Sequence, residues 1–547
     1  MSNNIKQNKK ISRDHKLFAK NSIYSFLITY SNYFGAMVTS FLMARLVTQE
    51  AWGFLIIATS IIAIFSLVET FLPPGLGFSL NYYIPRYLAL NQKNKLKSFV
   101  KTSIIIRVIV VLSTFLVSFI IFISLLDIFR ISLENHVNLL IILSPIIIIE
   151  GIDKFFNEIN RGFSLFNIIF ILNLIKFTVN IGALLYFFLF FDIIQIEIVA
   201  IINVISITIP FLVNIFIIFR KLSKLRTTEE KKLSFKSILK KSSIYGSQLS
   251  LHNFVNRLSN EFRIQMIPLF ETTEIVTGYN LANHYREIST GSVGSLGVPL
   301  TISFSGFYAL KQFDQIKKLY RILFKYSALL LLLVTGCLVF FSDFFIFLIY
   351  GSGFLKFSLL FKIVLISIIF SLQRNYFFSL LKASDKIKFL NPLSIIFSFI
   401  NTFTFVIGLI FFGIIGAVIL STIGSIINFI ISSILCVKLF KIKLDVLKYI
   451  LIYSSFFIAL TITNLLEGLV LSNFNFLILK GLNLLYFKKF NIFSLAVFSI
   501  IYIVLILIFK IFTRSDIDIL GAFFNKDTFL QKNIRKGLNI LRKFVWD

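Results

Sequence analysis

Residues 193–241, IIQIEIVAIINVISITIPFLVNIFIIFRKLSKLRTTEEKKLSFKSILKK, show the pattern that decides the fold. The first part, 193–219, is an apolar run long enough to cross a lipid bilayer as a helix. The second part is polar and carries nine Lys and Arg residues between Arg220 and Lys241. Because loops rich in Lys and Arg stay on the cytoplasmic side of a membrane, this segment predicts a transmembrane helix that ends in the cytoplasm.

The same pattern continues on both sides of this segment. Apolar runs predict spans at 22–46, 51–72, 99–126, 137–152, 164–190, 193–219, 243–268, 274–308, 320–348, 356–381, 390–412, 414–437, 446–470 and 490–513. Connections rich in Lys and Arg alternate with connections that are acidic or neutral; the exception is the last connection, up to Phe490, which carries Lys480, Lys488 and Lys489. The alternation predicts an all-α polytopic protein of the inner cell membrane, with about 14 transmembrane helices and both termini in the cytoplasm.

The composition supports this class and excludes others. The chain has 547 residues, of which 57% are hydrophobic, and its mean hydropathy is +0.88, so lipid must be its outer solvent. The 55 Lys and Arg residues outnumber the 25 Asp and Glu residues, but they adjoin spans, which favours contact with anionic membrane lipid over nucleic acid. Cys337 and Cys436 both lie within spans, so we expect no disulfide and no metal site.

A weak internal repeat predicts how the spans are organised. Lys20-Asn21-Ser22-Ile23-Tyr24 opens the first span, and Lys241-Ser242-Ser243-Ile244-Tyr245 opens the seventh, although chance identity in a biased composition is the alternative. Duplication predicts two pseudo-symmetric six-helix bundles and two further helices at the C-terminus. The predicted parts are a first bundle at 1–219, a cytoplasmic linker at 220–242, a second bundle at 243–440, two extra transmembrane helices at 441–515 and a cytoplasmic amphipathic tail at 516–547.

Polar residues inside the spans are the candidates for a binding site, because they are costly in lipid unless they face a wet cavity or a partner. In span 243–268 the polar residues fall on one helical face: Ser250, Asn253, Arg257, Asn260 and Glu261. This face predicts a cavity lining. The alternative is that Arg257 and Glu261, four residues apart, simply pair with each other.

Two further spans add to this face. In span 274–308 the polar residues are Asn280, Asn283, His284 and Glu287, with Arg286 beside them, and Lys176 lies in the middle of span 164–190. We expect Arg257, Arg286 and Lys176 to form a cationic cavity for a phosphorylated group, with Asn253 and Asn260 as further contacts. Glu261, Glu287 and His284 are candidates for coupling to H⁺ or Na⁺. Four charged residues lie nearer span ends, where we expect them to anchor the helices at the interface: Glu69, Arg107, Glu150 and Arg374.

The residues at the first predicted outer turn carry a family resemblance. Ala44-Arg45-Leu46-Val47-Thr48-Gln49-Glu50-Ala51-Trp52-Gly53-Phe54 resembles the corresponding turn of Wzx-type O-antigen flippases, in the multidrug/oligosaccharidyl-lipid/polysaccharide exporter superfamily. The family usually shows Ala-Arg-Leu-Leu followed by Pro-Glu-Glu-Tyr-Gly. This chain lacks the Pro and has Trp52 in place of the Tyr. Gln373-Arg374 and the segment 382–386 also resemble the family pattern.

The resemblance implies a flippase that moves polyprenyl-diphosphate-linked oligosaccharide from the inner to the outer leaflet for surface polysaccharide biosynthesis. It implies a monomer without enzymatic activity or a cofactor, apart from candidate Na⁺ or H⁺ coupling. A glycan polymerase or a glycosyltransferase is the candidate protein partner. The alternatives are an ion-coupled multidrug exporter of the same fold and a membrane glycan polymerase or glycosyltransferase. The short outer loops argue against an enzyme, because they leave little room for catalytic residues.

Overall fold

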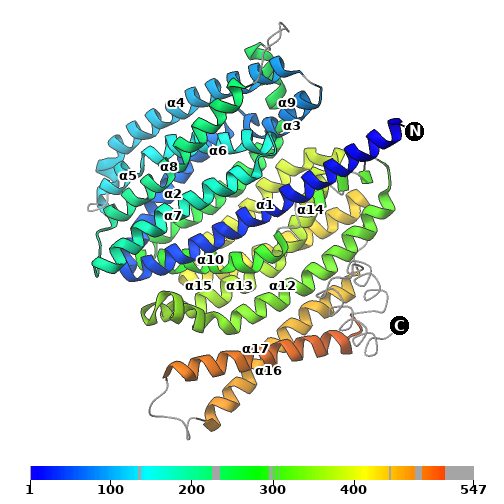
Figure 1. Ribbon diagram of the computed structural model, residues 1–547. Coiled ribbons are helices and arrows are strands. Elements are labelled where there is room, and N and C mark those ends of the chain that lie inside the picture. Colours follow the sequence, from blue (N-terminus) through cyan, green and yellow to red (C-terminus); the bar gives the residue numbers. More distant parts are fainter. Residues whose placement is uncertain are drawn as a thin grey trace. The chain divides into compact units, whose positions relative to one another are not determined.

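Every regular element in the described part of the chain is a helix, as the ribbon of the computed structural model shows (Figure 1). The structure describes residues 2–90, 92–133, 137–224, 234–294, 300–301, 304–305, 307–308, 310–442, 445–474 and 483–511. The predicted tail, 516–547, and the central part of the predicted linker, 225–233, lie outside these residues. The all-α fold that the sequence predicts is confirmed.

The helices follow the predicted order of spans. The first eight are α1 (Ser2–Leu46), α2 (Gln49–Phe71), α3 (Leu76–Ala89), α4 (Lys93–Leu133), α5 (Val137–Leu143), α6 (Pro145–Gly162), α7 (Phe166–Phe190) and α8 (Ile196–Ser223). The others are α9 (Phe235–Met266), α10 (Thr273–Gly294), α12 (Phe313–Tyr350), α13 (Ser358–Ser367), α14 (Leu372–Lys382), α15 (Leu390–Phe440), α16 (Val446–Phe474) and α17 (Asn483–Ile508). Each of the fourteen predicted spans overlaps at least one of these helices.

The lengths and the hydropathy of these helices are those of a membrane protein. Within the described residues, eight helices are long and apolar enough to cross a bilayer. The longest apolar stretch, Asp385–Phe440, contains two predicted spans, and Gly413 separates them with a backbone φ of 65°. Glycine tolerates this left-handed conformation because it has no Cβ. The protein is therefore a multi-pass membrane protein, and α15 contains two predicted spans that meet at Gly413.

The sequence analysis did not predict α3, a short helix between the second and third spans. It begins after Gly75, whose φ is 78°, and it packs along the first half of α9. The two helices meet where the backbones of Gly75 and Gly246 touch, and the buried hydroxyls of Ser79 and Ser242 are hydrogen-bonded at 3.1 Å. The small residues at this point allow the close approach, because a side chain on either glycine would meet the other backbone.

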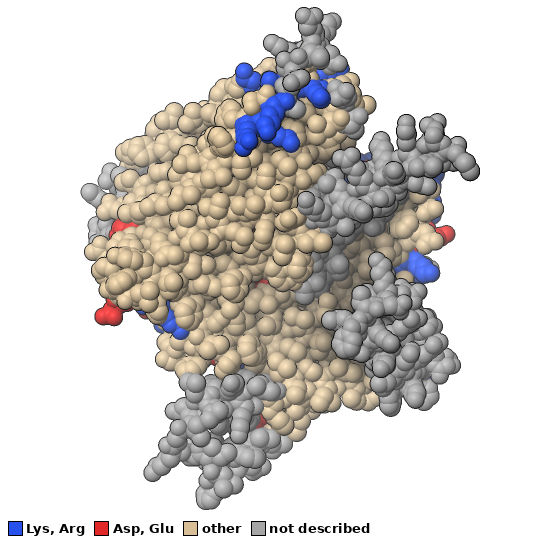
Figure 2. Space-filling view, viewed as in Figure 1, with Lys and Arg blue, Asp and Glu red and all other residues tan. Residues whose placement is uncertain are grey.

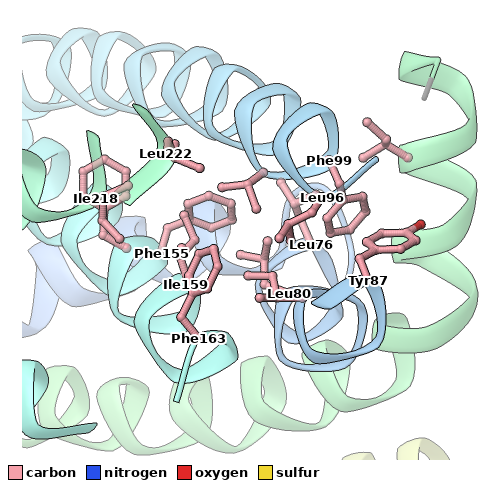
Figure 3. Close-up of a cluster of buried hydrophobic side chains, with 14 of the residues drawn as sticks. Leu76, Leu80, Tyr87, Leu96, Phe99, Phe155, Ile159, Phe163, Ile218 and Leu222 are labelled. Atoms are coloured by element: carbon pink, nitrogen blue, oxygen red, sulfur yellow. The ribbon is translucent and has the colours of Figure 1, made fainter. Parts of the chain in front are cut away.

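A buried apolar cluster holds α6 in place (Figure 3). It joins α3, α4, α6 and α8, and the residues labelled in the figure are Leu76, Leu80, Tyr87, Leu96, Phe99, Phe155, Ile159, Phe163, Ile218 and Leu222. Helix α6 is amphipathic, and its polar residues recur at a spacing of three or four: Glu150, Asp153, Lys154, Asn157, Glu158 and Arg161. Burial of the apolar face in this cluster fixes the direction of the polar face, which lines the cavities described below.

The chain forms two compact units. The first contains Met1–Ile288, Ile349–Gly353 and Leu381–Ser425, and the second contains Ser289–Leu348, Phe354–Leu380 and Ile426–Asp547. In the second unit the ring of Phe498 on α17 lies against Gly336 on α12, and the Tyr502 hydroxyl donates to the Leu329 carbonyl at 3.3 Å. The predicted division into bundles at 1–219 and 243–440 stays a prediction.

The described surface in Figure 2 is almost free of charge on the face shown. Lys and Arg side chains are visible mainly in a group at the upper edge of this view. An uncharged surface with a group of basic residues at one edge suits contact with lipid tails and anionic head groups.

Candidate functional site

Two cavities in the first compact unit contain most of the polar residues that the sequence analysis singled out. We call the first the basic cavity; it has a volume of about 390 Å³ and lies among the α2–α3 turn, α3, α4, α6 and α9. Four of its lining side chains are cationic, namely Arg107, Lys154, Arg161 and Arg257, and Glu158 is its one carboxylate. Its formal charge is therefore +3. The neutral polar lining comes from Asn157, Ser250, Asn253 and Asn256.

The four cations of the basic cavity differ in how firmly they are held. Arg161 donates to Glu158 at 2.7 Å, and Lys154 forms a salt bridge with Glu150. Arg107 donates to the Gly151 carbonyl at 3.0 Å. Arg257 is exposed and has no hydrogen-bond or salt-bridge partner among the described residues. Its guanidinium can therefore donate to a ligand in this cavity without giving up a bond within the described structure.

The second cavity, which we call the mixed cavity, has a volume of about 470 Å³ and lies among α2, α5, α6, α8, α9 and α10. Its lining carries both signs of charge: Arg263 and Arg286 against Glu150, Glu261 and Glu287. His284 and four asparagines, Asn203, Asn260, Asn280 and Asn283, also line it. This chemistry differs from that of the basic cavity, because carboxylates outnumber cations and side-chain amides are abundant.

Several groups in the mixed cavity are fixed by neighbours. Glu261 accepts a hydrogen bond from the Ser60 hydroxyl at 2.8 Å, and His284 Nδ1 lies 3.7 Å from a Glu287 carboxylate oxygen. Asn283 donates to the Tyr279 carbonyl at 2.9 Å. By contrast, the amides of Asn260 and Asn280 make no hydrogen bond within the described part of the chain.

The structure distributes the predicted site residues between these two cavities. Arg257 and Asn253 line the basic cavity. The mixed cavity is lined by Arg286, Asn260, Glu261, Glu287 and His284. Lys176 on α7 lines neither cavity, although its charge acts on Glu150. Arg257 and Glu261 form no salt bridge in the described structure, since Glu261 is bonded to Ser60. The role of these residues in binding stays a prediction.

The sequence analysis missed Lys154, Arg161 and Arg263 as cavity residues. It also placed Arg107 and Glu69 at the membrane interface, and this prediction was wrong, because they are only 4% and 0% exposed and lie 3.7 Å apart. Lys154 and Arg161 were missed because residues 153–163 were treated as a connection between spans. The spacing of three and four among the polar residues there was the signal that α6 continues with a polar face.

Comparisons with known proteins agree with this architecture. The family model described as "Polysaccharide biosynthesis protein" matches residues 18–301. No curated protein matches the sequence.

Solved structures of transporters share the fold. An inward-facing multidrug resistance MATE family transporter of the MOP superfamily has a TM-score of 0.61 at 14% identity, covering 74% of this chain and 94% of its own. A MOP superfamily transporter from Pyrococcus furiosus has a TM-score of 0.58 at 14% identity, covering 78% and 96%. A mutant of the Vibrio cholerae MATE transporter VcmN has a TM-score of 0.56 at 17% identity, covering 78% and 97%. At these identities the similarity shows the fold alone.

Proposed function

Because the chain belongs to the polysaccharide biosynthesis protein family, we propose that it is a flippase for polyprenyl-diphosphate-linked oligosaccharide. It moves this lipid from the inner to the outer leaflet of the cell membrane, with both termini of the chain in the cytoplasm. The multi-pass membrane fold shared with MOP superfamily transporters supports translocation without covalent chemistry. A glycan polymerase or a glycosyltransferase is the protein partner that this activity would need on either side of the membrane.

The charge of the basic cavity is the observation that carries this proposal. Four cationic side chains against one carboxylate, bordered by apolar helices, suit a diphosphate whose lipid tail stays in the bilayer. Guanidinium groups match phosphate oxygens in a bidentate geometry, and low local polarity strengthens that attraction. Because Arg257 has no hydrogen-bond or salt-bridge partner among the described residues, we propose it as the principal diphosphate contact.

The mixed cavity supplies groups that suit coupling of transport to an ion gradient. Glu261, Glu287 and His284 are proposed to couple transport to H⁺ or Na⁺, since carboxylates and imidazole change charge on protonation and carboxylate oxygens can also bind Na⁺. The protein then alternates between inward-open and outward-open forms.

A multidrug exporter of the same fold is the second candidate. The excess of carboxylates in the mixed cavity favours it, because a cationic drug needs anionic partners. In the Pyrococcus furiosus transporter, the reverse polarity of the binding pocket suggests a different function for that protein. We apply the same reasoning to the basic cavity here, whose charge would repel a cationic drug.

Replacement of Arg257 tests the flippase. Arg257→Ala should weaken binding of polyprenyl diphosphate to the purified protein by about tenfold to a hundredfold, because hydrogen bonds to charged groups contribute about 1.5–3 kcal/mol. Arg257→Lys should recover part of this loss by keeping the charge. Arg220→Ala, at the exposed end of α8, is the matched control. If the wild-type protein binds no polyprenyl diphosphate, and cells without it become drug-sensitive, the exporter replaces the flippase.

A further inference from the structure

We infer that the mixed cavity is the glycan chamber of this transporter, and that Asn260 and Asn280 recognise the sugar attached to the diphosphate. The inference rests on the proposed function, and it extends that function from the lipid diphosphate to the part of the substrate that differs between glycans.

The two cavities adjoin along α6. Glu150 lines the mixed cavity, and Lys154, four residues further along the helix, lines the basic cavity. These two side chains form a salt bridge, so one turn of α6 separates the two cavities. Four residues of an α-helix rise about 6 Å.

Neighbouring residues of α9 also line different cavities. Arg257 lines the basic cavity, whereas Asn260 and Glu261 line the mixed cavity. On both helices, residues three or four positions apart therefore line different cavities, so the cavities adjoin along α9 as well as along α6. A diphosphate held by Arg257 therefore has its neighbouring chemical group at the entrance of the mixed cavity. In a lipid-linked glycan that group is the first sugar.

The hydrogen-bonding groups that line the mixed cavity complement those of a sugar. A side-chain amide offers two donors and an acceptor, which complements hydroxyl and acetamido groups. Asn260 and Asn280 retain all of these groups for a ligand, because they bond to nothing in the described part of the chain. The volume of about 470 Å³ lies in the range of small-molecule sites.

The charges of the two cavities indicate which part of the substrate each cavity would bind. The basic cavity carries +3, but in the mixed cavity three carboxylates face two cations. An acidic sugar would meet Glu150, Glu261 and Glu287 at close range, and like charges at such distances are repelled. The chamber is consequently suited to a neutral or an acetamido sugar, and unsuited to a second phosphate or a uronic acid.

The test compares lipids that differ only in the sugar. The probes for the purified full-length protein are polyprenyl diphosphate, and the same lipid carrying N-acetylglucosamine, galactose or glucuronic acid. Wild type should bind at least one of the two neutral-sugar lipids about tenfold more tightly than the sugar-free lipid, as two or three net hydrogen bonds would give. The double variant Asn260→Ala/Asn280→Ala should lose this preference and keep its affinity for the sugar-free lipid.

Two controls separate this inference from the proposed function. Asn173→Ala removes an amide of α7 that bonds to Asn32 and lines neither cavity, so it should preserve the preference. Arg257→Ala should weaken binding of every probe by the same factor. Equal affinity of wild type for all probes, tighter binding of the glucuronic acid lipid, or a preference that survives the double variant would each overturn the glycan chamber alone. Failure to bind even the sugar-free lipid would overturn the flippase itself.

Discussion

Lys154 and Glu150 form a salt bridge across one turn of α6, and the two partners line different cavities. Neither side chain is fully buried, since 41% of Lys154 and 25% of Glu150 is exposed. A diphosphate bound in the basic cavity, as proposed, would compete with Glu150 for the Lys154 ammonium group. In the proposed mechanism, arrival of the lipid leaves Glu150 without its cation, and this carboxylate becomes available to bind H⁺ or Na⁺.

Removal of this competition should strengthen lipid binding. In Glu150→Gln the Lys154 ammonium group is free for the diphosphate, so affinity for sugar-free polyprenyl diphosphate should rise about two- to fivefold, as expected for a partly exposed ion pair. Lys154→Gln should lower the affinity. Asp192→Asn, an exposed carboxylate between α7 and α8, is the control and should change neither value. Unchanged affinity in Glu150→Gln would show that the ion pair does not compete with the lipid.

Glu69 and Arg107 make a second ion pair, and this one is buried between α2 and α4. Removal of one partner leaves an uncompensated charge, so Arg107→Leu should destabilise the protein by about 3–5 kcal/mol. The double variant Glu69→Leu/Arg107→Leu should recover most of that loss, because no isolated charge remains. Thermal unfolding in detergent measures both effects. A double variant as unstable as Arg107→Leu alone would indicate that packing, rather than charge, explains the loss.

The positions of the helices could be predicted from the sequence because long apolar runs mark the segments that contact lipid. The separation of 390–412 from 414–437 illustrates this, since a Gly between two apolar runs marks the break that Gly413 makes in α15. The repeat of polar residues on α9 likewise identified the helix face that lines the cavities. Patterns along a single helix therefore predicted the break in α15 and the face of α9 that lines the cavities.

The grouping of residues from different helices could not be predicted. Arg257 and Glu261 lie one turn apart on the same face of α9, yet they open into different cavities, because α3 and α4 surround one and α8 and α10 the other. Arg107 and Glu69 look like interface anchors in sequence, and only the packing of α2 against α4 makes them a buried pair. Such pairings depend on tertiary neighbours, about which a single sequence carries no signal.

The contact of Gly75 with Gly246 gives a steric prediction. A Cβ on Gly246 would overlap the backbone of Gly75, so Gly246→Ala should force α3 and α9 apart and destabilise the protein by about 1–3 kcal/mol. Gly182→Ala on α7 is the matched control, because an added Cβ there meets open space and the helix gains up to about 1 kcal/mol. Thermal unfolding of the two variants should move in opposite directions. Equal stability of Gly246→Ala and wild type would show that α3 and α9 can move apart without loss of stability.

Three side chains tie the α1–α2 turn to other turns of the first compact unit. Arg45 donates to the Ile349 carbonyl at 2.6 Å, and Gln49 donates to the Gly353 carbonyl at 3.1 Å. The Thr277 hydroxyl donates to the Gln49 carbonyl at 2.7 Å. We call these residues the turn latch. In the proposed orientation the turn latch lies on the outer side, where it would hold the transporter closed to the outside.

Loss of the turn latch should favour the outward-open form. Each hydrogen bond contributes about 0.5–1.5 kcal/mol, so loss of two in Arg45→Ala with Thr277→Val should raise the population of that form by about fivefold to a hundredfold. The reporter is Thr59→Cys, at a lining position of the mixed cavity, in a protein whose two native cysteines are replaced by serine. A membrane-impermeant maleimide applied from outside should label it faster when the turn latch is removed. Glu50→Ala alters the same turn without removing a bond of the turn latch, so labelling as fast in Glu50→Ala as in the double variant would contradict this role.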